Sequence, residues 1–482
     1  ERYLKEHLQP AFTKELKKRS NFPFAHLSEE QAEEVMTTAR KRTERYRVMT
    51  GVECHHCHRR GDYVSKESIE GVDYWICAAP ECGEPEKLRV VASDSIDIVF
   101  DTPREMKVFS WKGSLDTTLS PNDSIRYYKS FLQSGLMSLD PHTGHIKAWV
   151  GGINHTHFQY DHVNKKSGRQ VGSTFKPFVY ARGLDDDKIQ PCEVESTGPV
   201  IVEYGNGMQW SPQNSGKTAP ELTFYQGLQQ SVNTITARIM KRLGPNSAEV
   251  VKQTAANMGI DDSKFEPYPS ICLGTMDISV FEMVGAYGAF ANQGIYVKPT
   301  MITRIEDKNG TLLYQSVPET KDVISAESAY VTVNLLEGVT KFGSGARLRH
   351  NIPEEDRNPV YRDVVTGYPY SFDNAIAGKT GTTQNQSDGW FMGMVPNLVT
   401  GVWVGAEDRA THFETIAYGQ GATMALPIWG MFMKKCYENE ELGISKEDFL
   451  APEELSIPID CEVIKPVEED NSEAEDLKGL GL

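Results

Sequence analysis

The sequence predicts a mixed α/β protein of the α+β kind, in which helices flank a five-stranded, mostly antiparallel sheet. Segments 136–139 and 145–150 flank Asp140-Pro141-His142-Thr143-Gly144, a composition typical of a hairpin turn. Three later segments have strand character and are separated by short turns that contain Gly, Pro or Asn: 375–383, 389–395 and 399–405. The long stretch between these two groups has helical character, which predicts a mostly helical subdomain beside the sheet.

The first 119 residues divide into three regions by composition. Residues 1–50 are expected to form a helical linker, in which Ser28 and Gln31 make a capping box. Residues 51–90 differ in composition and form a cysteine-rich insert. Residues 91–119 are expected to form a small β subdomain, because segments 94–100 and 106–111 alternate as strands do.

The main domain is expected over residues 120–440, followed by an acidic C-terminal tail over 441–482. The final long helix of the main domain is predicted from Ala425 to about Tyr437. The end of the tail has few large apolar residues and many acidic ones, so we expect it to be solvated and disordered. These acidic residues are Glu462, Glu468, Glu469, Asp470, Glu473, Glu475 and Asp476.

Composition indicates a globular protein and argues against nucleic-acid binding. The hydrophobic share is 39%, the net charge is −17 and no basic stripe stands out. The sequence contains no run of about 20 apolar residues and opens with no signal peptide. Because the chain begins at Glu1 rather than Met, we expect it to be part of a longer protein.

A serine and a lysine three positions apart, Ser173 and Lys176, form the first candidate catalytic pair. A serine hydroxyl is a poor nucleophile until a neighbouring base takes its proton. Residues 168–172 have loop character and Pro177 suits a first helical turn, so we expect a helix from Ser173 on which the two side chains share a face. Lys176 must be neutral to act as the base, which requires burial or a neighbouring cation, for which Lys379 is the candidate.

Two later segments complete the pattern. Ser231 is expected at the entry to a second helix that ends at Gly244-Pro245, so its hydroxyl can point back into a cleft. Residues 376–383 have strand character. The small bulk around Gly381 would let a substrate backbone lie alongside as an added strand.

Ser-x-x-Lys, Ser-x-Asn and Lys-Thr-Gly occur here in the order typical of acyl-serine enzymes that act on D-Ala-D-Ala peptides and β-lactams. Together with the flanking residues 168–178 and 388–393, they make the chain resemble a bacterial penicillin-binding protein, specifically the transpeptidase half of a class A member. The resemblance covers about residues 95–440 and implies the same sheet-and-helix fold, with the penicillin-binding transpeptidase domain over 120–440.

The resemblance also implies roles for the catalytic residues. Ser173 would attack the substrate, Lys176 would take its proton, and Ser231 would relay a proton between Lys176 and the leaving group. Asn233 would donate a hydrogen bond to, or accept one from, the substrate amide.

The third motif would bind the substrate. Lys379, Thr380 and Thr382 suit the carboxylate that ends a D-Ala-D-Ala peptide, and Gly381 and Thr383 belong to the same substrate-binding strand. The family pattern implies an oxyanion hole from the backbone N–H groups of Ser173 and Thr382, and one such donor is typically worth about 3 kcal/mol of barrier.

The implied function is D,D-transpeptidation of peptidoglycan stem peptides ending in D-Ala-D-Ala, with acylation by β-lactams and no cofactor for catalysis. The alternatives are a D,D-carboxypeptidase or a β-lactamase, which use water as acceptor, and a β-lactam-binding sensor. The resemblance places the protein in the periplasm, at the outer face of the cytoplasmic membrane. Full-length relatives carry a membrane anchor and a glycosyltransferase domain, and we expect this chain to lack that second activity.

Four cysteines of the insert, Cys54, Cys57, Cys77 and Cys82, form two close pairs that suit a zinc ribbon. The second pair has four intervening residues where a zinc ribbon has two, and His55, His56 and His58 are alternative ligands. An insert of this size has too little core to fold unaided, so we expect a structural zinc ion or another staple. Two disulfides are an alternative in an extracytoplasmic compartment. Covalent haem is another, because residues 54–58 also spell C-x-x-C-H.

The remaining cysteines, Cys192, Cys272, Cys436 and Cys461, are widely spaced. Pairing of Cys192 with Cys272 and of Cys436 with Cys461 is compatible with the sequence, as are buried free thiols.

Overall fold

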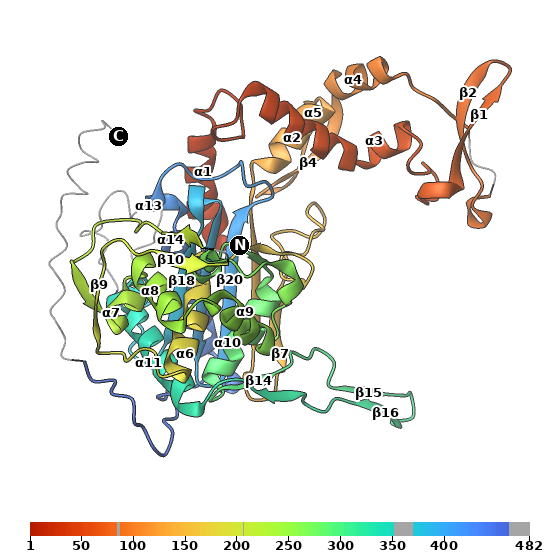
Figure 1. The fold of residues 1–482 in the computed structure, drawn as a ribbon. Helices are drawn as coiled ribbons and strands as arrows, with labels where there is room; N and C mark the ends of the chain where they lie inside the picture. Colours follow the sequence, from red (N-terminus) through yellow and green to blue (C-terminus); the bar gives the residue numbers. More distant parts are fainter. Residues whose placement is uncertain (84–86, 206, 351–369, 462–482) are drawn as a thin grey trace.

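The computed structural model describes residues 1–482 except 84–86, 206, 351–369 and 462–482. Its centre is an antiparallel five-stranded sheet with the strand order β18–β19–β20–β6–β7 (Figure 1). The strands are β6 (Leu132–Leu139), β7 (Ile146–Val150), β18 (Ala377–Thr382), β19 (Asp388–Val395) and β20 (Leu398–Ala406). The predicted fold class and all five predicted strands are therefore confirmed.

Helices cover both faces of the sheet, so its central strands are buried along their whole length. Every residue of β19 and β20 is buried. Because successive side chains of a strand point to opposite faces, Trp390 packs into one hydrophobic cluster and Phe391 into another. The first cluster holds α6 (Lys176–Asp185), α8 (Asn233–Leu243), α10 (Val280–Ala291) and α11 (Ala326–Phe342), and the second holds α1 (Gln9–Leu16) and α15 (Leu426–Glu438).

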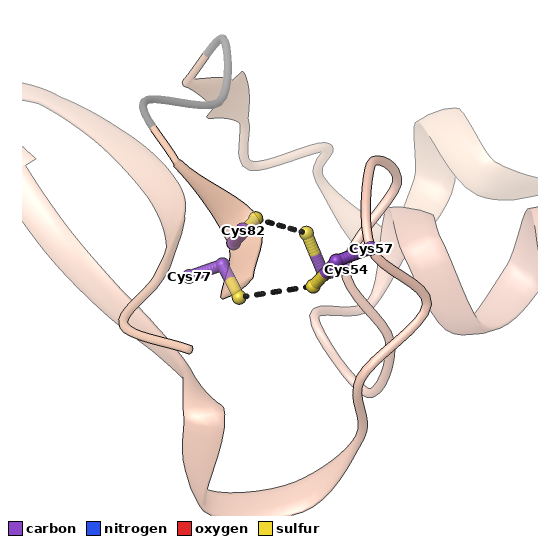
Figure 2. A group of neighbouring side chains, drawn as sticks. All are labelled: Cys54, Cys57, Cys77 and Cys82. Carbon is purple, nitrogen blue, oxygen red and sulfur yellow. Dashed lines mark hydrogen bonds between the residues drawn. The ribbon is translucent and has the colours of Figure 1, made fainter. Parts of the chain in front are cut away.

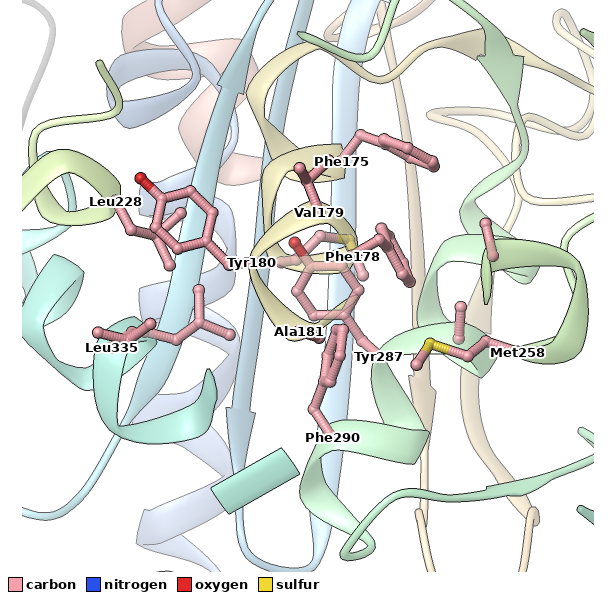
Figure 3. Close-up of a cluster of buried hydrophobic side chains, with 14 of the residues drawn as sticks. Phe175, Phe178, Val179, Tyr180, Ala181, Leu228, Met258, Tyr287, Phe290 and Leu335 are labelled. Atoms are coloured by element: carbon pink, nitrogen blue, oxygen red, sulfur yellow. The ribbon is translucent and has the colours of Figure 1, made fainter. Parts of the chain in front are cut away.

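Helix α6 runs through the middle of the first cluster (Figure 3). Its side chains pack against α10, α11 and α7 (Phe224–Gln229), and the residues that Figure 3 labels on these three helices are Leu228, Tyr287, Phe290 and Leu335. The Tyr287 hydroxyl donates a 2.6 Å hydrogen bond to the Thr174 carbonyl at the start of α6. This packing fixes the position of the segment that begins with Ser173.

The N-terminal region is largely helical, as predicted. It contains a π-helix η1 (Leu4–Leu8), α1, α2 (Glu29–Arg42) and α3 (Glu44–Met49). The predicted capping box is present: the Gln31 amide donates to the Ser28 hydroxyl at 3.2 Å and the Ser28 amide donates to the Gln31 side chain at 2.9 Å. Phe12 of α1 is fully buried against the sheet, so the first helices belong to the core of the main domain.

The strand predicted over 94–100 is wrong, because this segment forms helix α4 (Ser93–Asp101). Ile96, Val99 and Phe100 recur at helical spacing and Phe100 is fully buried, which favours the helix over the alternating pattern of a strand. The second predicted strand is confirmed as β4 (Arg104–Ser110), which pairs with β5 (Gly113–Leu119) in a hairpin.

The cysteine-rich insert contains a small sheet of β1 (Val64–Ile69), β2 (Val72–Cys77) and β3 (Leu88–Arg89). It extends from α3 and α4 away from the five-stranded sheet (Figure 1). The ring of Trp75 lies against Gly51, where an added Cβ would come within 2.3 Å of it, and the Trp75 indole donates a 3.0 Å hydrogen bond to the Met49 carbonyl. These contacts attach the small sheet to the end of α3.

The other elements connect these parts. The helices are α5 (Pro121–Lys129), α9 (Ser247–Asn257), α13 (Ile416–Gly419) and α14 (Gly421–Met424). The short strands are β8 (Arg169–Gln170), β9 (Val194–Ser196), β10 (Val202–Tyr204), β11 (Met208–Trp210), β12 (Glu221–Thr223), β13 (Asp277–Ile278), β14 (Ile295–Val297), β15 (Arg304–Glu306), β16 (Leu312–Gln315) and β17 (Thr320–Asp322). The 3₁₀ turns are η2 (Gly61–Tyr63), η3 (Pro80–Cys82), η4 (Gly172–Phe175), η5 (Asp262–Lys264), η6 (Pro269–Leu273), η7 (Ala346–Arg349), η9 (Gln384–Gln386) and η10 (Glu440–Leu442).

The chain after α15 folds back onto the main domain. Phe449 and Ile457 are buried in the first hydrophobic cluster, and Cys461 forms a disulfide with Cys192. Both pairings considered from the sequence are therefore wrong, and Cys272 and Cys436 are free thiols. The acidic residues of the predicted tail, from Glu462 onward, lie outside the described residues.

None of the helices in the described part of the chain combines the length and the apolar character that crossing a membrane requires.

Candidate active site

Ser173 lies in the 3₁₀ turn η4, immediately before α6. The predicted helix is present, but its first turn is the tighter 3₁₀ form and the α-helix starts at Lys176, with Pro177 in its first turn as expected. Thr174 and Phe175 are buried, whereas Ser173 is only partly buried. The turn therefore holds the serine at the edge of the core, where its hydroxyl can meet a substrate.

Two glycines bring this turn against the edge strand β18. An added Cβ on Gly172, whose φ is +54°, would lie 2.8 Å from the Thr382 carbonyl oxygen. On the other side, the Gly172 amide donates a 2.9 Å hydrogen bond to the carbonyl of Gly274, which has no room for a side chain. A larger residue would push the nucleophile segment off the strand, so this close approach requires glycine.

The amine of Lys176 is fully buried and is surrounded by oxygen acceptors. It donates to the Ser231 carbonyl, to the Asn233 side-chain oxygen at 2.8 Å and to the Ser231 hydroxyl at 3.2 Å. Within the described residues, it makes no hydrogen bond with the Ser173 hydroxyl, so the predicted direct contact is not formed in this state. A contact of this kind often tightens only when substrate binds.

Burial lowers the pKa of Lys176 from its usual value near 10.5 to about 7, and the nearby Cys272 thiol acts in the opposite direction. The charged amine loses its hydration in the core, which favours the neutral form. The predicted loss of charge at Lys176 is thus supported, but burial is its main cause rather than the charge of Lys379. A substantial fraction of the amine is neutral near pH 7 and can accept a proton.

The Ser231 hydroxyl lies between the two buried lysines. It accepts a hydrogen bond from Lys379 at 2.8 Å and one from Lys176 at 3.2 Å. Ser231 sits between α7 and α8 with φ +58°, a left-handed backbone conformation that is uncommon for a serine. This conformation directs the carbonyl and the hydroxyl of one residue toward the same amine.

Lys379 is fully buried on β18, and its amine also donates to the Thr380 carbonyl at 3.2 Å. Burial, and then repulsion by Lys176, holds the pKa of Lys379 well below its usual range. The two amines share one hydroxyl and repel each other when both are charged. This repulsion lowers the pKa of whichever amine is protonated second. The pair is therefore a place where a proton can be held and passed.

Asn233, the first residue of α8, is tied into the same network. Its side-chain oxygen accepts from Lys176 and its amide group donates a 2.8 Å hydrogen bond to the Gln213 carbonyl. Asn214 of the same loop caps the helix, because its side-chain oxygen accepts from the Thr234 amide at 3.0 Å. The loop between β11 and β12 thus helps to hold Asn233 beside the lysine.

The substrate-binding residues predicted on β18 have different surroundings. Thr380 meets Ser344 at 2.6 Å between the hydroxyls, and Thr382 accepts from the Gly421 amide at 3.0 Å. Thr383 is buried at the end of the β18–β19 hairpin, where its hydroxyl accepts a 3.0 Å hydrogen bond from the Asp388 amide. Its described contacts hold the hairpin closed, and the role of Thr383 in substrate binding stays a prediction.

The reason we expected for Gly381 also needs correction. An added Cβ there would lie 2.7 Å from the Val171 carbonyl oxygen and 2.8 Å from the Thr174 side chain. The absent side chain makes room for the turn that carries Ser173 rather than for a substrate backbone. β18 is nevertheless an edge strand of the sheet, so one side of its backbone is not paired with another strand of that sheet.

Sequence reasoning missed a buried ion pair that attaches the segment before Ser173 to the sheet. The Arg169 guanidinium donates to the Asp388 carboxylate at 2.6 Å, and the Trp403 indole donates to the same carboxylate at 3.0 Å. Arg169 also lies over the Trp403 ring, 4.8 Å from its centre. Arg169 and Asp388 stand in the segments 168–178 and 388–393 that flank the Ser-x-x-Lys and Lys-Thr-Gly motifs, but the sequence indicated no role for either residue. Ser344 was missed because no motif contains it.

The four cysteines of the insert come together with one another, and the insert with β1 and β2 lies apart from α6, which follows Ser173 (Figure 1). They are the candidate metal ligands among the described residues, together with a group of exposed Glu44, buried Glu53 and exposed His58. Glu53 of that group is already paired with Arg47 and Arg60 at 2.7 Å.

Comparison with known proteins agrees with this geometry. The profile of the "Penicillin binding protein transpeptidase domain" matches residues 135–413, and that of the "Penicillin-binding protein middle domain" matches residues 87–132. Penicillin-binding protein 1A of Aquifex aeolicus is 31% identical over 323 residues, which cover 66% of this chain and 40% of the relative. The protein of the same name from Neisseria meningitidis is 31% identical over 312 residues, 63% of this chain and 36% of its own length.

Solved structures show the same fold. PonA1 of Mycobacterium tuberculosis aligns with a TM-score of 0.53 and 25% identity, covering 68% of this chain and 81% of that one. Penicillin-binding protein 1A of Haemophilus influenzae aligns with a TM-score of 0.56 and 20% identity, covering 93% and 66%. The chain thus spans about two fifths of the length of the curated relatives quoted above.

Proposed function

The chain belongs to the penicillin-binding protein transpeptidase family, and from this premise we propose that it is a peptidoglycan D,D-transpeptidase that works through an acyl-enzyme on Ser173. The observation that carries the proposal is the Ser231 hydroxyl held between two buried lysines. This arrangement is what a serine nucleophile needs beside it: a base that is neutral near pH 7 and a route for the proton.

In the first step the Ser173 oxygen attacks the carbonyl between the last two D-alanines of a stem peptide. The hydroxyl proton passes to Lys176, and Ser231 passes a proton on to the nitrogen of the departing D-Ala as the peptide bond breaks. In the second step an amine of a neighbouring stem peptide attacks the acyl-serine and loses its proton through the same pair. Ser173 regains its hydroxyl, and one new amide bond replaces the bond that was broken.

Lys379, with the hydroxyls of Thr380 and Thr382 nearby, supplies hydrogen-bond donors for the carboxylate of the terminal D-Ala. The unpaired edge of β18 can receive the extended peptide as a further strand. The close approach of Gly172 to Thr382 supports the proposal that the amides of Ser173 and Thr382 form the oxyanion hole. Gly381 contributes by letting these segments approach.

The proposed location is the periplasmic side of the cytoplasmic membrane, where peptidoglycan is cross-linked. The Cys192–Cys461 disulfide suits an oxidising compartment outside the cytoplasm. Stem peptides and β-lactams are the proposed partners of the site, and none of the catalytic steps uses a cofactor.

Intact-mass spectrometry after incubation with benzylpenicillin tests the acyl-enzyme. We expect one adduct on the wild-type chain, none on Ser173→Ala, and one on the control Ser316→Ala, which changes a serine of the β15–β16 hairpin. A folded wild-type chain without an adduct would overturn the proposal.

The fate of the acyl group separates the related functions. With a D-Ala-D-Ala peptide and a stem-peptide amine, a transpeptidase forms the cross-linked product, a carboxypeptidase releases only the shortened peptide, and a sensor forms neither. Rapid loss of the penicillin adduct would instead indicate a β-lactamase. Any of these three results would overturn transpeptidation while leaving Ser173 as the nucleophile.

A further inference from the structure

The cysteine-rich insert brings four thiols from two chain segments to one point. Cys54 and Cys57 come from the loop after α3, Cys77 ends β2, and Cys82 lies in η3 (Figure 2). Their sulfur atoms all lie within 4.8 Å of one another. The closest pairs, Cys54 with Cys82 and Cys57 with Cys77, are 3.6 Å apart.

We propose that these four cysteines bind one structural zinc ion. Zinc prefers four tetrahedral ligands, with Zn–S distances of about 2.3 Å, which places the sulfur atoms of one site about 3.8 Å apart. The observed separations match a tetrahedron of this size. Each segment contributes two ligands, so the ion would join the loop at residues 54–57 to the end of the small sheet.

The buried atoms of the insert support a metal rather than an ordinary core. Its hydrophobic cluster consists of Cys54, Ala79 and Cys82, with Cys57, Val64 and Cys77 packed against them. Four of these six residues are the proposed ligands, so little apolar surface remains to stabilise the insert without the ion. The His56 amide also donates a 3.4 Å hydrogen bond to the Cys54 sulfur, which stabilises a negatively charged thiolate.

Two disulfides fit the same atoms less well. A disulfide needs its sulfur atoms about 2.05 Å apart, whereas both closest pairs here are 3.6 Å apart. The same structure does contain a disulfide, between Cys192 and Cys461. The four thiols are arranged around a common centre rather than as two separate bonded pairs.

Covalent haem fits less well again. Cys54 and Cys57 would both have to bond to the porphyrin, but each faces a cysteine of the second segment. His58, the ligand that the C-x-x-C-H pattern would supply, is 59% exposed, and its ring nitrogen lies 3.3 Å from the carboxylates of Glu44 and Glu53.

Metal analysis of the purified chain tests the proposal. We expect one zinc per chain in the wild type and in Cys436→Ser, a matched control that removes a buried free thiol outside the insert. Cys77→Ser should lose the zinc. In cobalt-exchanged wild type we expect thiolate-to-cobalt charge transfer and the absorption of tetrahedral cobalt, a spectrum that Cys77→Ser should not give.

Cys77→Ser can also unfold the insert, and loss of zinc from this variant would then not identify Cys77 as a ligand. A second measurement therefore uses the wild-type chain alone. Thiol titration under denaturing conditions with a chelator should find six free cysteines. If the protein contains no zinc and only Cys272 and Cys436 react, the insert holds two further disulfides and the proposal is overturned. Bound iron or a haem absorption band would overturn it equally.

Hydrogen exchange supplies a readout that does not depend on activity. On chelation, amides of β1 and β2 should lose their protection from exchange, while those of β19 and β20 should keep theirs. Unchanged protection of the insert would contradict a structural role for zinc. Benzylpenicillin labelling of the same samples keeps this result separate from the proposed function, since the insert with β1 and β2 lies apart from α6, which follows Ser173 (Figure 1).

Discussion

The burial of Lys176 predicts a specific pH dependence for acylation. Burial lowers its pKa from near 10.5 to about 7. Only the neutral amine can accept the Ser173 proton, so the acylation rate should rise about tenfold per pH unit below pH 7 and level off above it. A lysine with an unperturbed pKa would instead give a rate that keeps rising to about pH 10.

Stopped-flow acylation by a chromogenic β-lactam between pH 5 and 10 measures this profile, using the second-order rate constant of the free enzyme. Because Lys379 shares the Ser231 hydroxyl, the inflection belongs to the pair of amines rather than to Lys176 alone. A rate still rising steeply above pH 9 would refute the argument that burial neutralises the base.

The same shift has a consequence for stability that can be measured without substrate. Between about pH 7 and 10.5 the unfolded lysine holds a proton that the native lysine has lost, so native stability rises with pH in this window. One unit of pKa shift corresponds to about 1.4 kcal/mol, and the whole shift to roughly 5 kcal/mol as an upper bound.

Urea unfolding of the wild type and Lys176→Met at several pH values isolates this effect. The methionine variant lacks the titrating group, so its stability relative to the wild type should decline by up to about 1.4 kcal/mol per pH unit across the window. A difference that does not change with pH would show that Lys176 keeps its proton in the folded protein.

Three further substitutions test other parts of the structure. Ser231→Ala removes the hydroxyl shared by the two lysines and should slow β-lactam acylation by about 10²–10⁴-fold, as measured by adduct formation over time. Gly172→Ala places a methyl group 2.8 Å from the Thr382 carbonyl oxygen on a backbone with φ +54°, so it should both slow acylation and lower the melting temperature. Cys192→Ser removes a link between residues 269 apart in sequence and should lower the free energy of unfolding by about 2–4 kcal/mol in urea.

Each of these has a result that would contradict it. Normal acylation in Ser231→Ala would remove Ser231 from the proton route, and normal acylation in Gly172→Ala would show that the turn can move without harm. Unchanged stability in Cys192→Ser would mean that the packing of Phe449 and Ile457 alone holds the end of the chain. Cys272→Ser is unsuitable as a control here, since that thiol lies near Lys176.

Local sequence patterns were sufficient for much of the fold and for the catalytic motifs. The five strands, the capping box at Ser28 and the helix 425–437 follow from turn composition, capping residues and apolar spacing, which act between near neighbours. The segment 94–100 was wrongly predicted as a strand, because so short an apolar pattern fits either a strand or a helix. In the folded chain, burial of Phe100 favours the helix.

By itself the sequence determined which residues we propose for the chemistry, because Ser173, Lys176, Ser231 and Lys379 stand in a recognisable order. Only the tertiary structure decided their contacts: Lys176 donates hydrogen bonds to Ser231 and Asn233 rather than to Ser173, and burial is the main cause of its lowered pKa. The sequence likewise did not predict that Cys192 forms its disulfide with Cys461. Burial, desolvation and the meeting of distant segments depend on the packed chain in three dimensions, and neighbouring residues alone do not encode them.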